Sequence, residues 1–357
     1  MTSKKRQHFV PRFYLRRFSN LPDRQSIDLW NMQSTLLVRH ASTRDQAYAD
    51  HFYSKDLIFE DALGQIDDGA SQILHVIEAT EQVPDYDSVI REPLLAYVLF
   101  QSERTKYAVQ AFRESSSKFN RIVFKTEEGL QGALATASEQ QENPSVFLLQ
   151  LASRILPVVT DLEMKLLRNR TECHFITSDN PVVKYNQFLE SRGWPGSHTG
   201  WATAGLQVFF PIGPTLCIVL YDRDVYRVGH RREYVVDVER TPDVDQLNAL
   251  QFLNADENIY FTSSVSDDYI LRLDHQYRRK RRTEKVSVEE FHGPDSAWPT
   301  RRTLVACSTC DVNMNLSLSF IAQTKKAKSR RVGPSMANPR NPRVLAQVEE
   351  AFGKNGL

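Results

Sequence analysis

His8 and Arg12 stand on either side of Pro11 near the start of the chain, where a short helix is predicted to begin. Proline suits the first helical turn because its missing N–H would have no partner there. Free N–H groups at such a turn attract anions, arginine offers a forked donor to phosphate oxygens, and histidine can act as acid or base. This spacing predicts half of a phosphate site. The structural alternative is that both side chains hydrogen-bond backbone carbonyls and fix the first helix.

A second polar group interrupts the apolar stripe of a helix predicted to start near residue 90 and to continue past residue 112. Gln101 and Thr105 fall on this stripe, and Arg104 is the surface neighbour of Gln101 three residues away. Polar groups that face a core are destabilising unless each finds a partner. Gln101 and Arg104 are therefore expected either in a buried structural network or in a site.

Asp179 lies in the string TSDNPV at 177–182, directly after a predicted strand. Acidic residues just beyond a strand end are where many proteins place metal or catalytic groups. The same string is also a good turn, because Asp and Asn hydrogen-bond nearby backbone and Pro presets φ. A Glu-x-Lys pair, Glu163 and Lys165, falls in a helix-prone stretch rather than a strand, which argues against a restriction-type nuclease core.

The sequence gives little support for a bound zinc ion, nucleotide or dinucleotide. Cys307-x-x-Cys310 has the spacing of a zinc knuckle, but no second such pair exists to complete four ligands. The patterns GxxxxGK[ST], GxGxxG, GxSxG and HExxH are absent, so ATPases, dinucleotide enzymes, ordinary serine hydrolases and zincins lose their main support. A divalent metal ion held by Asp179 stays open.

Charge is distributed unevenly along the 357 residues, although the formal net charge is only +1. Residues 321–357 contain eight Lys and Arg but two Glu, and a second basic run occupies 277–282. Because of these segments, nucleic acid and small anions are candidate partners. The simpler interpretation is that the basic residues form a solvated surface. No stretch approaches the roughly 20 apolar residues that span a bilayer, and no apolar segment follows the basic N-terminus. We therefore expect no membrane contact and a cytoplasmic location.

Hydrophobic periodicity predicts an α+β fold: a helix-rich N-terminal half packed on a mixed or antiparallel sheet in the second half, with a disordered basic tail. The predicted division is a main domain at 1–270 (a helical region at 1–169 and a β-rich region at 170–270), a basic extension at 271–324 and the tail at 325–357. The long loop at 190–205 is expected to cap a site. Helices are predicted at 60–81, 90–112, 146–156 and 243–253, and strands at 26–30, 35–39, 172–177, 207–210, 216–221 and 258–261.

These polar groups lie in motifs that together resemble one protein family. The opening QHFVPRFYLR at 7–16, Gln101-x-x-Arg104-Thr105, FITSDNPV at 175–182 and FPI at 210–212 occur in this order. They are similar to the uncharacterised family named domain of unknown function 4238, over roughly residues 7–265. The family carries no established activity. The resemblance implies that the motifs recur together, and hence that the polar residues within them converge.

Two hypotheses about function follow. In the first, the protein is an enzyme acting on a nucleic-acid or other phosphorylated substrate. His8 is then the acid or base and Asp179 a metal ligand or orienting group, while Arg12, Gln101 and Arg104 hold phosphate oxygens. In the second, it is a non-enzymatic binding or interaction protein, in which the same five residues form a buried structural network. The sequence leaves the metal requirement and the oligomeric state open.

Overall fold

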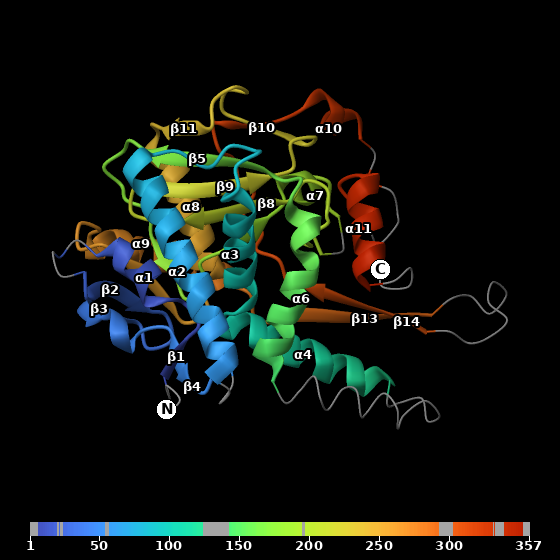
Figure 1. Cartoon of the computed structure of the whole chain (residues 1–357), viewed down its shortest axis with the longest axis horizontal. Helices are drawn as coiled ribbons and strands as arrows, with labels where there is room; N and C mark the ends of the chain where they lie inside the picture. The colour runs from blue at the N-terminus through green and yellow to red at the C-terminus, as the bar shows by residue number, and fades with distance from the viewer. Residues whose placement is uncertain are drawn as a thin grey trace.

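A mixed five-stranded sheet forms the centre of the molecule in the order β11-β5-β9-β8-β7 (Figure 1). The computed structural model describes residues 6–19, 21, 24–53, 57–123, 143–194, 197–292, 303–330, 332 and 339–352. Neighbouring strands are antiparallel except for β11 and β5, which run parallel. The strands are β5 (Glu163–Asn169), β7 (Val183–Tyr185), β8 (Gln207–Pro211), β9 (Leu216–Tyr221) and β11 (Val235–Val238).

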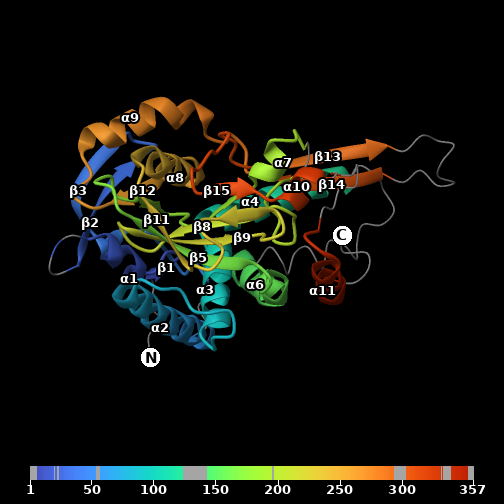
Figure 2. The ribbon, with the colours of Figure 1, turned by 90° about the horizontal axis from the view of Figure 1, so that it is seen from above.

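Both faces of this sheet are covered, which is why every residue of β8 and β9 is buried. Successive side chains of a strand point to opposite faces. Phe210 and Ile218 therefore join the core beneath the N-terminal helices, while Phe209 and Val219 join the core beneath α8 (Thr241–Asn254). Figure 2 shows these two layers on either side of the sheet. The N-terminal helices are α1 (Arg12–Leu15), α2 (Leu57–Thr80), α3 (Arg91–Glu103) and α6 (Pro144–Val159).

A second, antiparallel sheet has the order β3-β2-β12-β6. Its hairpin of β2 (Ser26–Asn31) and β3 (Leu36–Ser42) confirms the predicted pair of strands near the N-terminus. The short strand β6 (Thr177–Ser178) brings the TSDNPV string into the same sheet, beside β12 (Asn258–Phe261). Helix α9 (Asp267–Tyr277) packs against α8 over the core of this sheet.

The single helix predicted from residue 90 past residue 112 is divided in two. Helix α3 ends at Glu103 and α4 (Lys106–Val123) begins after Thr105. The side-chain oxygen of Thr105 accepts a hydrogen bond from the Ala108 N–H at 3.1 Å. This contact satisfies one of the unpaired N–H groups at the start of a helix, so Thr105 caps α4 and fixes the break.

Three further stretches differ from the sequence-based expectations. Residues 172–176, expected as a strand with Thr177, are irregular, and only Thr177–Ser178 form strand β6. The stretch Glu163–Asn169, expected as helix-prone, is strand β5 because β9 and β11 pair with it on both sides. In the predicted disordered tail, the described residues form α10 (Lys325–Ser329) and α11 (Pro342–Phe352), and the tail residues 331, 333–338 and 353–357 lie outside the described segments. Arg340 is 3% exposed and forms an ion pair with Asp161 at 2.8 Å. The Asp161 carboxylate thus pairs with an arginine of the tail that was expected to be solvated.

The remaining short elements complete the frame. Strand β1 pairs with β4, β10 with β15, and β13 with β14, all antiparallel. The β13–β14 hairpin projects from the body beside α4 (Figure 1). The α+β fold class is confirmed. The bounds are β1 (Arg6–His8), β4 (Tyr48–Asp50), β10 (Tyr226–Val228), β13 (Val286–His292), β14 (Thr303–Thr309), β15 (Ile321–Gln323), α7 (Gln187–Glu190), and the 3-10 turns η1 (Arg16–Phe18), η2 (Thr43–Asp45) and η3 (Arg278–Lys280).

Candidate functional site

Gln101 and Arg104 lie in the protein interior, where they are 0% and 1% exposed. The side-chain amide of Gln101 donates to the Phe9 carbonyl at 3.1 Å and accepts from Arg104 Nε at 2.8 Å. Arg104 Nη1 lies 2.8 Å from an Asp67 carboxylate oxygen. Burial raises the pKa of Asp67, and the positive charge of Arg104 opposes that rise. These contacts connect α2 and α3 to the N-terminal segment, so both residues stabilise the packing of these three segments.

Asp179 is also buried, at 4% exposure, and its carboxylate holds a backbone turn. Oδ1 accepts from the Asp256 N–H at 2.8 Å, while Oδ2 accepts from the N–H groups of Glu257 and Asn258 at 2.8 and 2.9 Å. Burial and the neighbouring Asp256 carboxylate raise the pKa of Asp179 to about 7, against the effect of the three N–H groups. The acceptor positions of Asp179 are thus occupied by backbone. Among the described residues, no three His, Cys, Asp or Glu side chains are grouped to hold a metal ion.

His8 and Arg12 lie beside each other and are half-buried. The Nδ1–H of His8 donates to the Gln46 carbonyl at 3.0 Å. Burial lowers the pKa of His8, and the charges of Arg12 and Arg6 lower it further, which favours neutral imidazole. Within the described residues no hydrogen bond connects His8 or Arg12 to Asp179. None of the five predicted residues lines the cleft described below.

Other atoms of the same motifs do meet in the interior. The hydroxyl of Tyr14 donates to the Pro211 carbonyl at 2.6 Å and lies 2.7 Å from the hydroxyl of Thr177. The hydroxyl of Thr105 donates to the side-chain oxygen of Asn180 at 3.2 Å. Satisfied buried polar networks of this kind rigidify a fold. All four motifs of the sequence are thus joined by hydrogen bonds.

Strand β5 places Glu163 and Lys165 on a strand, contrary to expectation, but the strand does not create a nuclease site. Lys165 is 3% exposed and its ammonium donates to the carbonyls of Val228 and His230 at 2.7 and 2.6 Å. The ammonium is therefore engaged by backbone and is not presented to a substrate.

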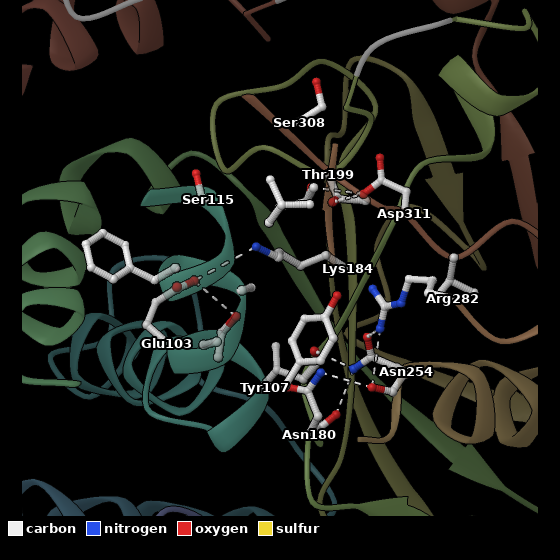
Figure 3. A pocket seen from close by; sticks show the side chains of 18 of the residues that line it. Glu103, Tyr107, Ser115, Asn180, Lys184, Thr199, Asn254, Arg282, Ser308 and Asp311 are labelled. Atoms are coloured by element: carbon white, nitrogen blue, oxygen red, sulfur yellow. Dashed lines mark hydrogen bonds and ion pairs between the residues drawn. The ribbon is translucent and has the colours of Figure 1, made fainter. Parts of the chain in front are cut away.

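A cleft lies between α3, α4, β7 and the base of the β13–β14 hairpin (Figure 3), with a cavity volume of about 280 Å³. Its walls include the immediate neighbours of the motif residues. Ser102 and Glu103 sit between Gln101 and Arg104, and Asn180 follows Asp179. Gln101, Arg104 and Asp179 point into the protein interior, whereas their neighbours in the sequence line the cleft. The other polar residues of the lining are Tyr107, Ser115, Lys184, Thr199, Asn254, Arg282, Ser308, Thr309 and Asp311.

One wall of the cleft carries Lys184 and Glu103, which both contact Trp201. Lys184 Nζ lies 3.9 Å from a carboxylate oxygen of Glu103 and 4.9 Å from the ring centroid of Trp201. The indole N–H of Trp201 donates to the same Glu103 oxygen at 3.0 Å. Glu103 therefore partly neutralises Lys184 and orients it towards the cavity.

The opposite wall holds Arg282 and Tyr107. Arg282 donates to the Cys310 carbonyl at 3.0 Å and to the side-chain oxygen of Asn254 at 3.1 Å, two neutral acceptors that fix the guanidinium without neutralising it. Its central carbon lies 4.6 Å from the ring centroid of Tyr107. The hydroxyl of Tyr107 is buried and has no hydrogen-bond partner among the described residues. Figure 3 shows this hydroxyl directed between Lys184 and Arg282.

The remaining lining is mainly apolar, and Thr199, Thr309 and Asp311 within it are hydrogen-bonded. The carboxylate of Asp311 accepts from the His198 N–H and from the hydroxyls of Thr199 and Thr309. Thr199 belongs to the loop expected to cap a site, and Asp311 holds that loop at the cleft. Burial raises the pKa of Tyr107, so its hydroxyl is a donor at neutral pH. The apolar lining comprises Ala108, Ala111, Phe112, Leu148, Val182, Val286 and Val312.

The basic run at 277–282 is partly engaged by protein groups, while Arg278, Arg279 and Lys280 are exposed. Arg278 pairs with Asp274 at 2.8 Å, and Arg281 donates to the carbonyls of Ala255 and Asp256 at 2.7 Å. These contacts leave less of the run's charge available to nucleic acid than the sequence suggested. Tyr107 and Lys184 were not singled out from the sequence, because neither stands in a recognisable motif. Arg282 was noted only as a member of the charge run.

The family model for proteins of unknown function named DUF4238 matches residues 6–264. Arg282, Asp311 and the base of the hairpin lie beyond the matched residues, so this wall of the cleft comes from outside them. No curated protein and no solved structure matches the chain. Among the described helices, none combines the length and apolar character needed to cross a membrane.

Proposed function

Because the chain belongs to the DUF4238 family, whose function is unknown, we propose from the cleft itself that the protein binds a small organic anion. The ligand carries a carboxylate or phosphate at one end and an apolar body at the other. This is the binding-protein alternative of the two hypotheses, and it places the ligand in the cleft, which the sequence analysis did not identify.

The observation that carries this proposal is the buried, unpartnered hydroxyl of Tyr107 between Lys184 and Arg282. A buried donor without a partner costs about 1–3 kcal/mol, and native proteins retain few of them. An anionic oxygen of a ligand would accept from this hydroxyl. The same oxygen would gain the charge of Arg282, whose protein partners are neutral.

The size and walls of the cavity support a small ligand with an apolar body. Ligand pockets span roughly 300–1,000 Å³ and are lined mainly by apolar groups around a few polar ones. The cavity of about 280 Å³ lies just below this range and suits a small ligand. Phe112, Leu148 and Val286 offer surface for the body of the ligand, while the two cations hold its charged end.

Isothermal titration calorimetry with benzoate, phenyl phosphate and benzylamine tests the proposal. Benzylamine is the control ligand, because it keeps the ring and reverses the charge. Wild type is expected to bind at least one of the two anions and not the amine. Tyr107→Phe and Lys184→Met should each weaken binding about fivefold to tenfold.

Lys106→Met is the matched control variant, since Lys106 pairs with Glu257 and does not line the cleft. It is expected to bind as wild type does, and so is His8→Ala. Equal affinity for benzylamine and the anions would contradict the proposal. So would unchanged affinity in both Tyr107→Phe and Lys184→Met.

A further inference from the structure

A second group of cations lies outside the cleft, where the first helix meets the turn η2. Arg12 belongs to α1, Arg16 follows it by one helical turn at the start of η1, and Arg44 lies in η2. The two segments are in contact. They are fastened by the Phe9 N–H, which donates to the Ala47 carbonyl at 2.9 Å, and by the bond from His8 to Gln46.

Arg12 and Arg16 differ from their neighbour Arg17 in what they contact. Arg17 donates to the carbonyls of Ile212 and Leu74 at 2.6 and 2.9 Å and lies 3.1 Å from Glu78. The Nε atoms of Arg12 and Arg16 are buried and have no hydrogen-bond partner among the residues that the structure describes. Each of these two half-buried side chains therefore has one buried N–H donor without an acceptor in the described part of the chain. The neighbouring Arg44 is exposed.

The charge of this cluster is poorly compensated. After burial, the charges of Arg16 and Arg44 are the main causes that lower the pKa of Arg12. The nearby carboxylate that opposes them, Asp45, is engaged by Arg6 at 2.6 Å. Positive potential is thus concentrated at one point of the surface, and an anion there would relieve the repulsion among the guanidinium groups.

We propose that Arg12, Arg16 and Arg44, with His8 beside them, bind a phosphate group. Guanidinium forks match the oxygens of a phosphate, and a phosphate has more acceptor oxygens to share among three forks than a carboxylate has. The cluster lies at the surface and not in one of the described cavities, so the rest of the ligand extends into solvent. This site is independent of the cleft beside Tyr107.

Two probes distinguish a free phosphate compound from the phosphates of a nucleic-acid strand. Pyrophosphate is added while the His8 imidazole is titrated by NMR, with His8→Gln used to assign its signal. Fluorescein-labelled single-stranded RNA of about 12 nucleotides, a typical length for such sites, is followed by fluorescence anisotropy. Both measurements use the full chain at low ionic strength, since phosphate contacts weaken with salt.

In wild type, bound pyrophosphate is expected to raise the pKa of His8 by about 1, because a nearby anion favours the imidazolium form. Arg12→Ala/Arg16→Ala should abolish this rise and weaken any RNA binding about tenfold. Arg44→Ala changes an exposed side chain, so it tests the cluster even where the double variant folds poorly. Arg113→Ala, an exposed arginine of α4, is the control.

If wild type responds to pyrophosphate but does not bind RNA, the ligand is a free phosphate compound. If it binds RNA and the variants weaken that binding, the ligand is a nucleic-acid strand. An unshifted His8 titration together with no RNA binding by wild type would overturn the proposal. Binding of either probe that is the same in wild type, Arg44→Ala and the double variant would overturn it as well.

Discussion

Replacing Arg104 by leucine leaves the Asp67 carboxylate without its ion-pair partner and the side-chain oxygen of Gln101 without its donor. Removing one partner of a buried ion pair costs about 3–5 kcal/mol. The Asp67 side chain is 25% exposed, which places the loss near the lower end of that range. The lost hydrogen bond to Gln101 adds about 1 kcal/mol. We therefore expect Arg104→Leu to lower the free energy of unfolding by about 3–4 kcal/mol.

Urea unfolding at neutral pH, followed by circular dichroism and tryptophan fluorescence, measures this loss as a lower midpoint. Asp67→Leu/Arg104→Leu removes both charges, so it should recover some of the stability lost in Arg104→Leu. Arg113→Leu on the exposed face of α4 is the control and should unfold with wild type.

The reasoning would be refuted if Arg104→Leu unfolded at the wild-type midpoint. If that stable variant also lost binding of benzoate and phenyl phosphate, Arg104 would act on a ligand and the first hypothesis would regain support. A double variant less stable than Arg104→Leu would contradict the role given to Asp67.

Three further outcomes are expected. Tyr14→Phe, which removes the hydroxyl that bonds Thr177 and a backbone carbonyl, should lower the free energy of unfolding by about 1–3 kcal/mol in urea unfolding; an unchanged midpoint would contradict the proposed network. Asp179 has a pKa of about 7 in the folded protein against 3.8 for the free side chain, so the folded state holds a proton more tightly and this contribution to stability is lost as pH rises towards and through 7. Asp179→Asn should therefore be less stable than wild type at low pH but show a flatter fall in stability between about pH 4 and about pH 7, and an equal fall in both proteins would refute the assignment. Arg340→Leu leaves Asp161 unpaired beneath α11, so limited proteolysis should cut the C-terminal segment faster than in wild type; equal rates would show that the ion pair does not hold it.

Local sequence signals correctly predicted the elements in which the residue types and the flanking residues favour the same structure. Strands β9 and β12 have the predicted bounds because β-branched and aromatic residues are enclosed by Pro, Gly, Asn and Asp. Strand β5 consists largely of good helix formers, Glu, Met, Lys, Leu and Arg. Its pairing with β9 and β11 overrides that preference, and this pairing joins residues far apart in the chain.

The sequence by itself marked Gln101, Asp179 and the opening segment, because they carry polar groups where an apolar pattern or a turn needs an explanation. The resemblance to the family grouped their motifs. The sequence did not determine which way each side chain points. Helix rotation and the turn held by Asp179 direct Gln101 and Arg104 inward and Glu103 and Asn180 into the cleft. Which of two neighbouring residues faces inward depends on the partners available in the interior, such as Asp67 and the Phe9 carbonyl. Those partners come from distant segments, so only the tertiary structure decides it.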